Sequence, residues 1–160
     1  MISITDLAER VDTQFENATG DYRALVVLNP TDEPYTGLAV LRVRMPLKPN
    51  AQPHPAGIWD EQGNPMPCQI LNSHLEPATE FRLPDGTPRP LPEGSRIWQF
   101  DLWFWVQEVP PRGYRVYRSE WVAQEVPLPY PPPETAPPVQ VREALPHPGD
   151  LPKVGVVPDG

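Results

Sequence analysis

Cysteine, basic residues and long apolar runs are all scarce in this chain of 160 residues. Its one cysteine, Cys68, permits no internal disulfide, so the fold cannot depend on oxidative cross-links. The 21 acidic side chains outnumber the 13 basic ones, and the formal net charge of −8 repels phosphate backbones and anionic lipid surfaces. No apolar stretch reaches the roughly 18 residues of a membrane span, and no basic region followed by an apolar stretch opens the chain. We therefore expect a soluble, cytoplasmic protein whose partners are neither nucleic acid nor membrane.

Proline is the residue in excess, and its distribution divides the chain. Of the 26 prolines, eleven lie in the last 34 residues. A stretch that is about one-third proline favours extended polyproline geometry over a packed core. We therefore divide the chain into an N-terminal helical segment (1–20), a β-sandwich domain (21–126) and a proline-rich tail or linker (127–160).

Hydrophobic periodicity predicts one helix followed by several short strands. Apolar residues repeat at helical spacing between residues 3 and 16. Beyond residue 20 they form a short continuous run, as in 24–28, or alternate with polar residues, as in 38–45. Proline and glycine turns separate these segments. The pattern predicts an all-β protein, an antiparallel β-sandwich with a short N-terminal helix and an extended proline-rich C-terminal tail.

The strongest predicted strand covers residues 97–109. One of its faces is an unbroken apolar series, made of Trp98, Phe100, Leu102, Phe104 and Val106. The opposite face mixes aromatic and polar side chains, among them Gln99, Asp101, Trp103 and Trp105. We interpret the first face as the buried seam between two stacked sheets.

The second face of this strand supplies the candidate binding residues Trp103, Trp105, Asp101 and Gln99. A sugar ring could stack on the two indoles while the polar side chains bind its hydroxyl groups. The alternative is that both indoles are buried beneath the N-terminal helix, the proline-rich loops or another domain. Both interpretations remain open at the level of sequence.

The sequence offers no candidate catalytic or metal-binding residue. The three histidines are far apart: His54, His74 and His147. None of them forms a ligand spacing with another histidine or with Cys68, which lies in a predicted strand and is expected to pack as a small buried hydrophobe. Asp60 falls at a turn, where a carboxylate caps backbone N–H groups. We therefore predict no catalytic residue, metal or cofactor in this chain.

The proline-rich tail has two interpretations of its own. The segment Pro129-Tyr130-Pro131-Pro132 satisfies the P-x-x-P spacing of polyproline ligands. No basic residue flanks it between Arg118 and Arg142, although such ligands commonly carry one. A stiff interdomain spacer is therefore favoured, and a recognition segment is the alternative.

Three segments, taken in order, carry a family resemblance. They are Leu25-Val26-Val27-Leu28-Asn29-Pro30, the hairpin Ile-Trp-Asp-Glu-Gln-Gly-Asn-Pro-Met-Pro-Cys-Gln at 58–69, and the strand pair at 104–117 built around Val-Pro-Pro-Arg-Gly-Tyr. Their order and spacing resemble the β-sandwich region that follows the catalytic and helical domains in α-mannosidases of glycoside hydrolase family 38. The resemblance covers about residues 1–118. The chain departs from the family pattern at 31–34 and in the proline-rich stretch 84–94.

The resemblance implies a supporting rather than a catalytic role. In that family the zinc ligands and catalytic aspartates belong to the N-terminal domain, and nothing in this sequence matches them. It therefore implies a non-catalytic structural domain of a larger α-mannosidase-like enzyme that acts on α-linked mannose or related glycans. Its expected partners are the other domains of that enzyme and carbohydrate, and zinc is expected only in the catalytic domain. Two alternatives remain, an autonomous carbohydrate-binding module that uses exposed tryptophans and a protein-interaction domain with a proline-rich ligand tail.

Overall fold

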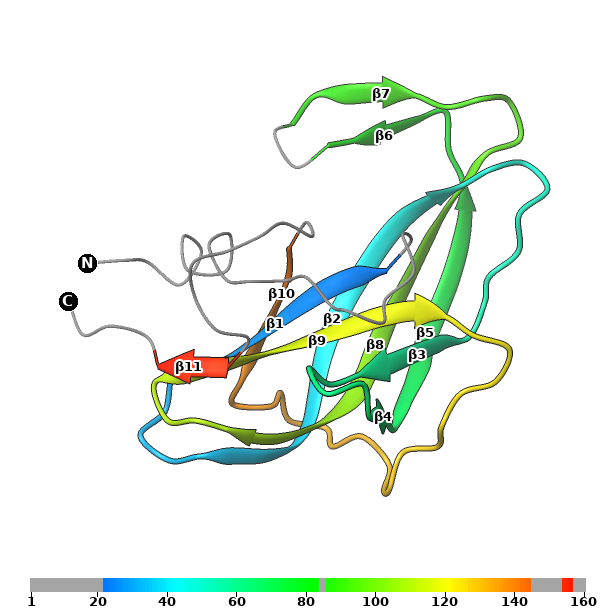
Figure 1. Ribbon diagram of the computed structural model, residues 1–160. Coiled ribbons are helices and arrows are strands. Elements are labelled where there is room, and N and C mark those ends of the chain that lie inside the picture. Colours follow the sequence, from blue (N-terminus) through cyan, green and yellow to red (C-terminus); the bar gives the residue numbers. More distant parts are fainter. Residues whose placement is uncertain (1–21, 84–85, 145–153, 157–160) are drawn as a thin grey trace.

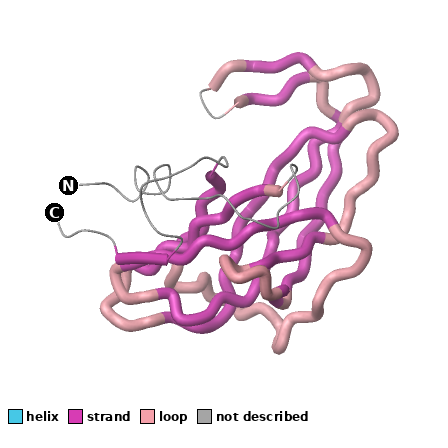
Figure 2. Tube along the Cα trace, in the orientation of Figure 1, coloured by secondary structure: helices cyan, strands magenta, loops and turns pink. Residues whose placement is uncertain are grey.

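A computed structural model describes residues 22–83, 86–144 and 154–156 (Figure 1). Every regular element in these ranges is a β-strand, which confirms the predicted all-β class (Figure 2). The predicted N-terminal helix lies outside the described residues. Within the described ranges no helix is long and apolar enough to cross a membrane.

The described residues form eleven strands. In chain order they are β1 (Arg23–Asn29), β2 (Tyr35–Leu47), β3 (Ala56–Trp59), β4 (Pro65–Met66), β5 (Cys68–Pro77), β6 (Glu80–Arg82), β7 (Pro88–Pro90), β8 (Arg96–Val109), β9 (Gly113–Trp121), β10 (Gln140–Ala144) and β11 (Val154–Val156). They are arranged in two main sheets, and all pairings are antiparallel. The larger sheet has the order β10-β1-β9-β3-β4, with β11 also paired to β9, and the smaller has the order β2-β8-β5.

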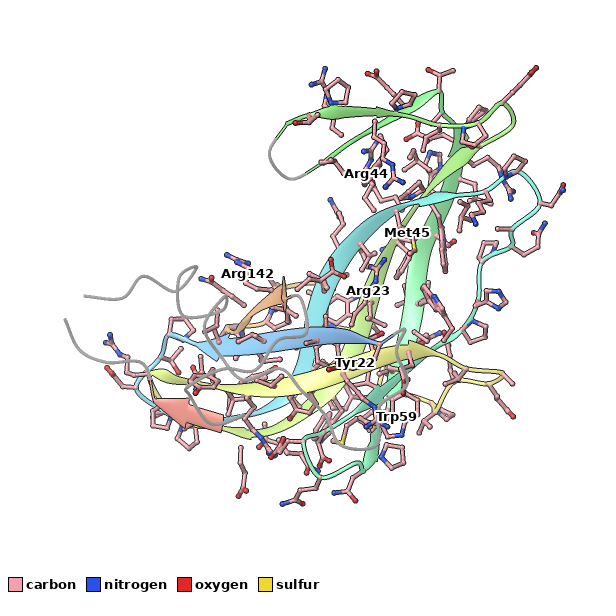
Figure 3. All side chains as sticks on the ribbon, turned by 45° about the horizontal axis from the view of Figure 1, so that its top comes forward. Tyr22, Arg23, Arg44, Met45, Trp59 and Arg142 are labelled. Carbon is pink, nitrogen blue, oxygen red and sulfur yellow. The ribbon has the colours of Figure 1, made fainter. Side chains whose placement is uncertain are left out.

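A small hairpin extends beyond the two main sheets. Strands β6 and β7 pair only with each other, and Figure 1 shows them projecting from one end of the molecule. Arg44 on β2, labelled in Figure 3, places its guanidinium carbon 5.9 Å from the centre of the Phe81 ring on β6. This cation–π contact ties the hairpin to the smaller sheet.

The core lies between the two main sheets, and β8 supplies its largest side chains. All five members of the apolar face predicted for 97–109 are buried, as expected: Trp98, Phe100, Leu102, Phe104 and Val106. Phe104 meets Tyr117 of β9 edge-on, with ring centres 5.9 Å apart, so the two sheets interlock through aromatic rings. This packing of two antiparallel sheets face to face is that of a β-sandwich.

Strand β1 is buried on both faces, as its continuous apolar run predicts. Residues 24–29 are all buried, and the strand pairs with β9 along one edge and with β10 along the other. Because β1 is buried on both faces and paired along both edges, no part of it needs polar side chains to face water. Strands β8 and β9 follow each other in the chain but lie in different sheets, and β9 pairs with β1 instead of β8.

Part of the predicted C-terminal tail is a strand of the sandwich. This corrects the expectation that the tail is extended throughout and lies outside the packed fold. Gln140–Ala144 form β10, with Val141 opposite Val27 of β1, and Val139 and Val141 join the core. Without β10 the edge groups of β1 would lack backbone partners. Two alternating valines among prolines are too weak a pattern to predict this strand. The division of the chain at residues 20 and 126 stays a prediction.

The segment between β9 and β10, residues 122–139, is here named the proline strap. It first pairs with the edge of β5, where Val126 accepts a hydrogen bond from the Cys68 amide at 2.9 Å and the Glu125 side chain accepts one from the Ile70 amide at 3.3 Å. Figure 1 shows it, yellow to orange, passing from the end of β9 beside β4 to β10. The strap therefore covers part of the outer face of the smaller sheet.

Candidate functional site

The turn between β3 and β4 is organised by one buried carboxylate. The two oxygens of Asp60 accept hydrogen bonds from the Gln62 amide at 2.9 Å, the Asn64 amide at 2.8 Å and Asn64 Nδ2 at 3.1 Å. Gly63 has a φ of 83°, a backbone conformation that glycine adopts without the steric clash that a side chain would cause. The predicted capping role of Asp60 is confirmed. Because this carboxylate is occupied within the turn, it is a poor general acid or base.

Replacing Asp60 by alanine is expected to lower the free energy of unfolding by about 1–3 kcal/mol, since the Asn64 and Gln62 amides lose their acceptor. Urea denaturation followed by tryptophan fluorescence measures this loss. Gln62→Ala in the same turn is the matched control and should change stability by less than about 0.5 kcal/mol, because Gln62 is exposed. Equal effects of the two substitutions would contradict the capping role.

The two outward tryptophans of β8 are half-buried rather than open to solvent. Tyr130 of the proline strap meets Trp105 edge-on, with ring centres 5.8 Å apart and an interplanar angle of 85°. Trp103 lines a hollow of about 350 Å³ with residues 133–136 of the strap. The residues that contact or face the two indoles belong to the predicted C-terminal tail, which was not among the covers considered from the sequence.

Of the two polar members of the candidate set, Asp101 lines the hollow of Trp103, whereas Gln99 lines neither tryptophan's hollow. Asp101 forms an ion pair with Arg42, its Oδ1 3.1 Å from Nε, and its Oδ2 accepts a hydrogen bond from Asn72 at 2.8 Å. In the strand register Gln99 lies opposite Arg44 on β2 and His74 on β5, two residues beyond Asp101. The candidate residues therefore lie along one face of β8, and Trp103 and Trp105 line separate hollows.

The hollow beside Trp105 takes its polar lining from two parts of the chain. Its volume is about 370 Å³, and its polar lining comes from Gln107 on β8 and from Asp60 and Asn64 in the β3–β4 turn. Pro129 of the strap closes one side. Strand alternation places Gln107 on the same face as Trp105, so the sequence alone predicts that the two side chains are neighbours. Asn64 is brought close only by the pairing of the strands.

Behind this hollow, three side chains fix the end of β8. Glu61 and Arg115 form an ion pair, and Arg115 Nη1 also donates to the Gln107 carbonyl at 2.6 Å. The Tyr117 hydroxyl accepts a hydrogen bond from the Gln107 amide at 3.0 Å. Burial raises the pKa of Tyr117 to about 12, so the hydroxyl stays neutral at physiological pH. The backbone of Gln107 is therefore held on both sides.

Cys68 is buried at the start of β5, as predicted. Its Sγ donates a hydrogen bond to the Ala56 carbonyl at 2.9 Å. Burial raises the pKa of the thiol to about 12, and the nearby charge of Glu125 acts in the same direction. A thiol that remains protonated is a poor nucleophile and a poor metal ligand.

Alkylation of Cys68 is expected to be very slow in the folded protein. Raising the thiol pKa from its ordinary value of 9.0 to about 12 lowers the thiolate fraction at pH 8 by about a thousandfold, and burial slows access further. The stabilisation from the neutral thiol is complete below pH 9 and is lost as the pH rises from 9 towards 12. Iodoacetamide labelling at pH 8, compared with the urea-unfolded chain, measures the difference. Similar rates in both states would show that the thiol is accessible and ionisable.

A groove of about 1030 Å³ lies between β5, residues 53–55 and the proline strap. Its lining is mostly proline and aliphatic, and its ionisable side chains include His54, Glu125 and the protonated Cys68. Glu125 is already engaged with the Ile70 amide. Ser73 also lines the groove, and its hydroxyl accepts a hydrogen bond from Trp98 Nε1 at 2.8 Å. Among the described residues no hydrogen bond joins His54 to Ser73 or Cys68, and Glu125 is the one carboxylate in the lining.

Metal-ligating side chains do not gather in the part of the chain that the structure describes, where no group of three from His, Cys, Asp and Glu occurs. His54 lies 6.4 Å from Trp121, measured between ring centres, and His74 lies 3.9 Å from Glu76 between Nε2 and Oε2. His147 falls outside the described residues. The described residues therefore offer no donor set that fits the zinc which the family resemblance implies for the catalytic domain.

Comparison with known proteins gives a likeness of fold. No protein-family model and no curated protein matches the chain. Among solved structures, an alpha-mannosidase from Enterococcus faecalis V583 superposes with a TM-score of 0.54 at 14% identity, over 76% of this chain and 14% of that chain. A protein in glycosyl hydrolase family 38 from Enterococcus faecalis gives a TM-score of 0.54 at 15% identity, over 76% of this chain and 15% of that chain. The chain thus spans about one-seventh of the proteins whose fold it shares.

Proposed function

We propose that this chain is a non-catalytic β-sandwich domain of a larger glycoside hydrolase related to the α-mannosidases of family 38. The observation that carries the proposal is the shared fold, which covers 76% of this chain but only 14–15% of the two enzymes. That ratio is expected for one domain of a multidomain enzyme. The three sequence segments that resemble the family lie in β1, across the β3–β4 turn and across the connection from β8 to β9, and all of these belong to the sandwich.

The hydrogen bonds and ion pairs of the described carboxylates favour a structural, non-catalytic role. The carboxylates best placed for acid–base work are already used, Asp60 as a turn cap and Asp101 in a pair with Arg42. Glycoside hydrolysis needs two carboxyl groups facing one scissile bond. The proposed partners are therefore the catalytic and other domains of the same enzyme, and the proposed location is the cytoplasm.

A hydrolysis assay tests the proposal. The purified chain is incubated with 4-nitrophenyl α-D-mannopyranoside, with and without added zinc, beside an intact α-mannosidase as a positive control. We expect no release of nitrophenol above the buffer rate. Turnover that co-elutes with the folded chain in gel filtration would overturn the non-catalytic role.

The alternative of a proline-rich recognition tail receives less support. The P-x-x-P segment packs along the groove beside β5, and Tyr130 contacts Trp105 of the same chain. A polyproline ligand must present its prolines to an aromatic groove on its partner. In this structure the prolines of the segment already lie against the chain's own smaller sheet, so they are not presented to a partner.

A further inference from the structure

We propose that the hollow between Trp105, Gln107 and Asn64 binds a single neutral sugar ring of the pyranoside class. The site differs from the set predicted along β8, because it combines one strand with the β3–β4 turn. It is independent of the proposed function, since an accessory domain and an unrelated sandwich could both carry it.

Trp105 gives the hollow a fixed aromatic wall. The indole is half-buried on β8, and its backbone amide donates to the Pro67 carbonyl at 2.9 Å. Tyr130 supports it edge-on from the strap, at 5.8 Å between ring centres. A preformed aromatic surface lets the C–H face of a pyranose ring pack without any loss of side-chain freedom on binding.

Two amides supply polar groups beside this wall. The Gln107 side chain is exposed and makes no hydrogen bond within the described part of the chain, although its backbone is held by Tyr117 and Arg115. Asn64 Nδ2 donates to Asp60, whose carboxylate can only accept, so the amide oxygen of Asn64 remains available as an acceptor. One amide that both donates and accepts, next to one acceptor, suits the hydroxyl groups of a sugar.

Charge and size narrow the ligand class. Glu61 and Arg115 neutralise each other behind the hollow, and the Asp60 oxygens are occupied by the turn. The hollow therefore offers no free cation for a phosphate or carboxylate, and the net charge of −8 disfavours anions further. Its volume of about 370 Å³ lies at the small end of ligand sites, about 300–1,000 Å³, which suits one ring rather than an extended chain.

Titration with methyl α-D-mannopyranoside and with methyl β-D-glucopyranoside tests the site, followed by the indole Nε1–H resonances in ¹⁵N–¹H spectra. At least one glycoside should shift the Trp105 resonance saturably, with a dissociation constant on the order of 1 mM for a ligand of this size. The resonances of Trp59 and Trp98 should not move, because neither lines the hollow.

Matched glutamine variants separate binding from folding. Gln107→Leu should weaken binding about fivefold, the effect of losing roughly one hydrogen bond, while Gln99→Leu on the same face of β8 should leave it unchanged. Absence of a saturable shift with both glycosides would overturn the proposal. So would equal binding by the two variants, or tighter binding of adenosine, a ring that stacks on indole without being a sugar. None of these results would change the outcome of the hydrolysis assay, so a failure of this proposal is distinguishable from a failure of the proposed function.

Discussion

Phe104→Ala is expected to lower the free energy of unfolding by about 3–5 kcal/mol. The ring has no exposed surface and lies between the sheets, where it contacts Tyr117 edge-on. Truncation removes its apolar burial, leaves a cavity and ends the aromatic contact between β8 and β9. A domain of this size is stable by only about 5–15 kcal/mol, so the loss is a large share of the total. Urea denaturation monitored by circular dichroism measures it.

A substitution on the other face of the same strand serves as the control. Gln99→Ala removes a side chain that points away from the core and should cost less than about 0.5 kcal/mol. If the two variants were equally stable, Phe104 would not lie in a packed seam, and the assignment of the inner face of β8 would be wrong.

Truncation after Val126 is expected to lower the free energy of unfolding by at least about 3 kcal/mol or to prevent folding. It removes Val139 and Val141 from the core, and burial of a valine side chain contributes about 1.5–3 kcal/mol. It also strips β1 of five residue pairs with β10, from Ala24 with Ala144 to Leu28 with Gln140. Urea denaturation of the shortened chain against the full chain gives the difference.

Two point variants in the full chain keep this prediction testable if the shortened chain does not fold. Val141→Asp places a charge in the core and should destabilise strongly, whereas Gln140→Asp lies on the exposed face of the same strand and should have little effect. A truncated chain as stable as the full one would instead support the interpretation of residues 127–160 as a linker.

The sandwich could be predicted in outline because its strands carry their own signals. The alternation from Trp98 to Val106 identifies the buried face of β8, and the unbroken run at 24–28 marks β1 as a central strand. The β3–β4 turn could also be predicted from the sequence, since Asp60 and Gly63 stand where a turn needs a capping side chain and a residue with positive φ. These features depend on neighbours close in sequence.

The proline strap and β10 were not predictable in the same way. Val139 and Val141 are two valines in a proline-rich stretch, and their strand exists because β1 offers a partner more than a hundred residues earlier. The partial burial of Trp105 likewise depends on Tyr130, which reaches it only when the strap crosses the sheet. Pairing between distant segments, rather than local propensity, decides both features.

The candidate binding set illustrates the same limit. Sequence alternation correctly placed Gln99, Asp101, Trp103 and Trp105 on one face of β8. It could not reveal that Asp101 is engaged by Arg42 and Asn72. Nor could it show that the β3–β4 turn brings Asn64 to the hollow beside Trp105.

Native-state hydrogen exchange tests most directly whether the two sheets, with β10 included, form one closed sandwich. The amides that pair β1 with β10 should exchange through the same global opening as those that pair β1 with β9, with equal free energies and equal urea dependence. Exchange of the β10 amides at the rate of an unstructured chain, while the β1 and β9 pairs stay protected, would contradict that structure.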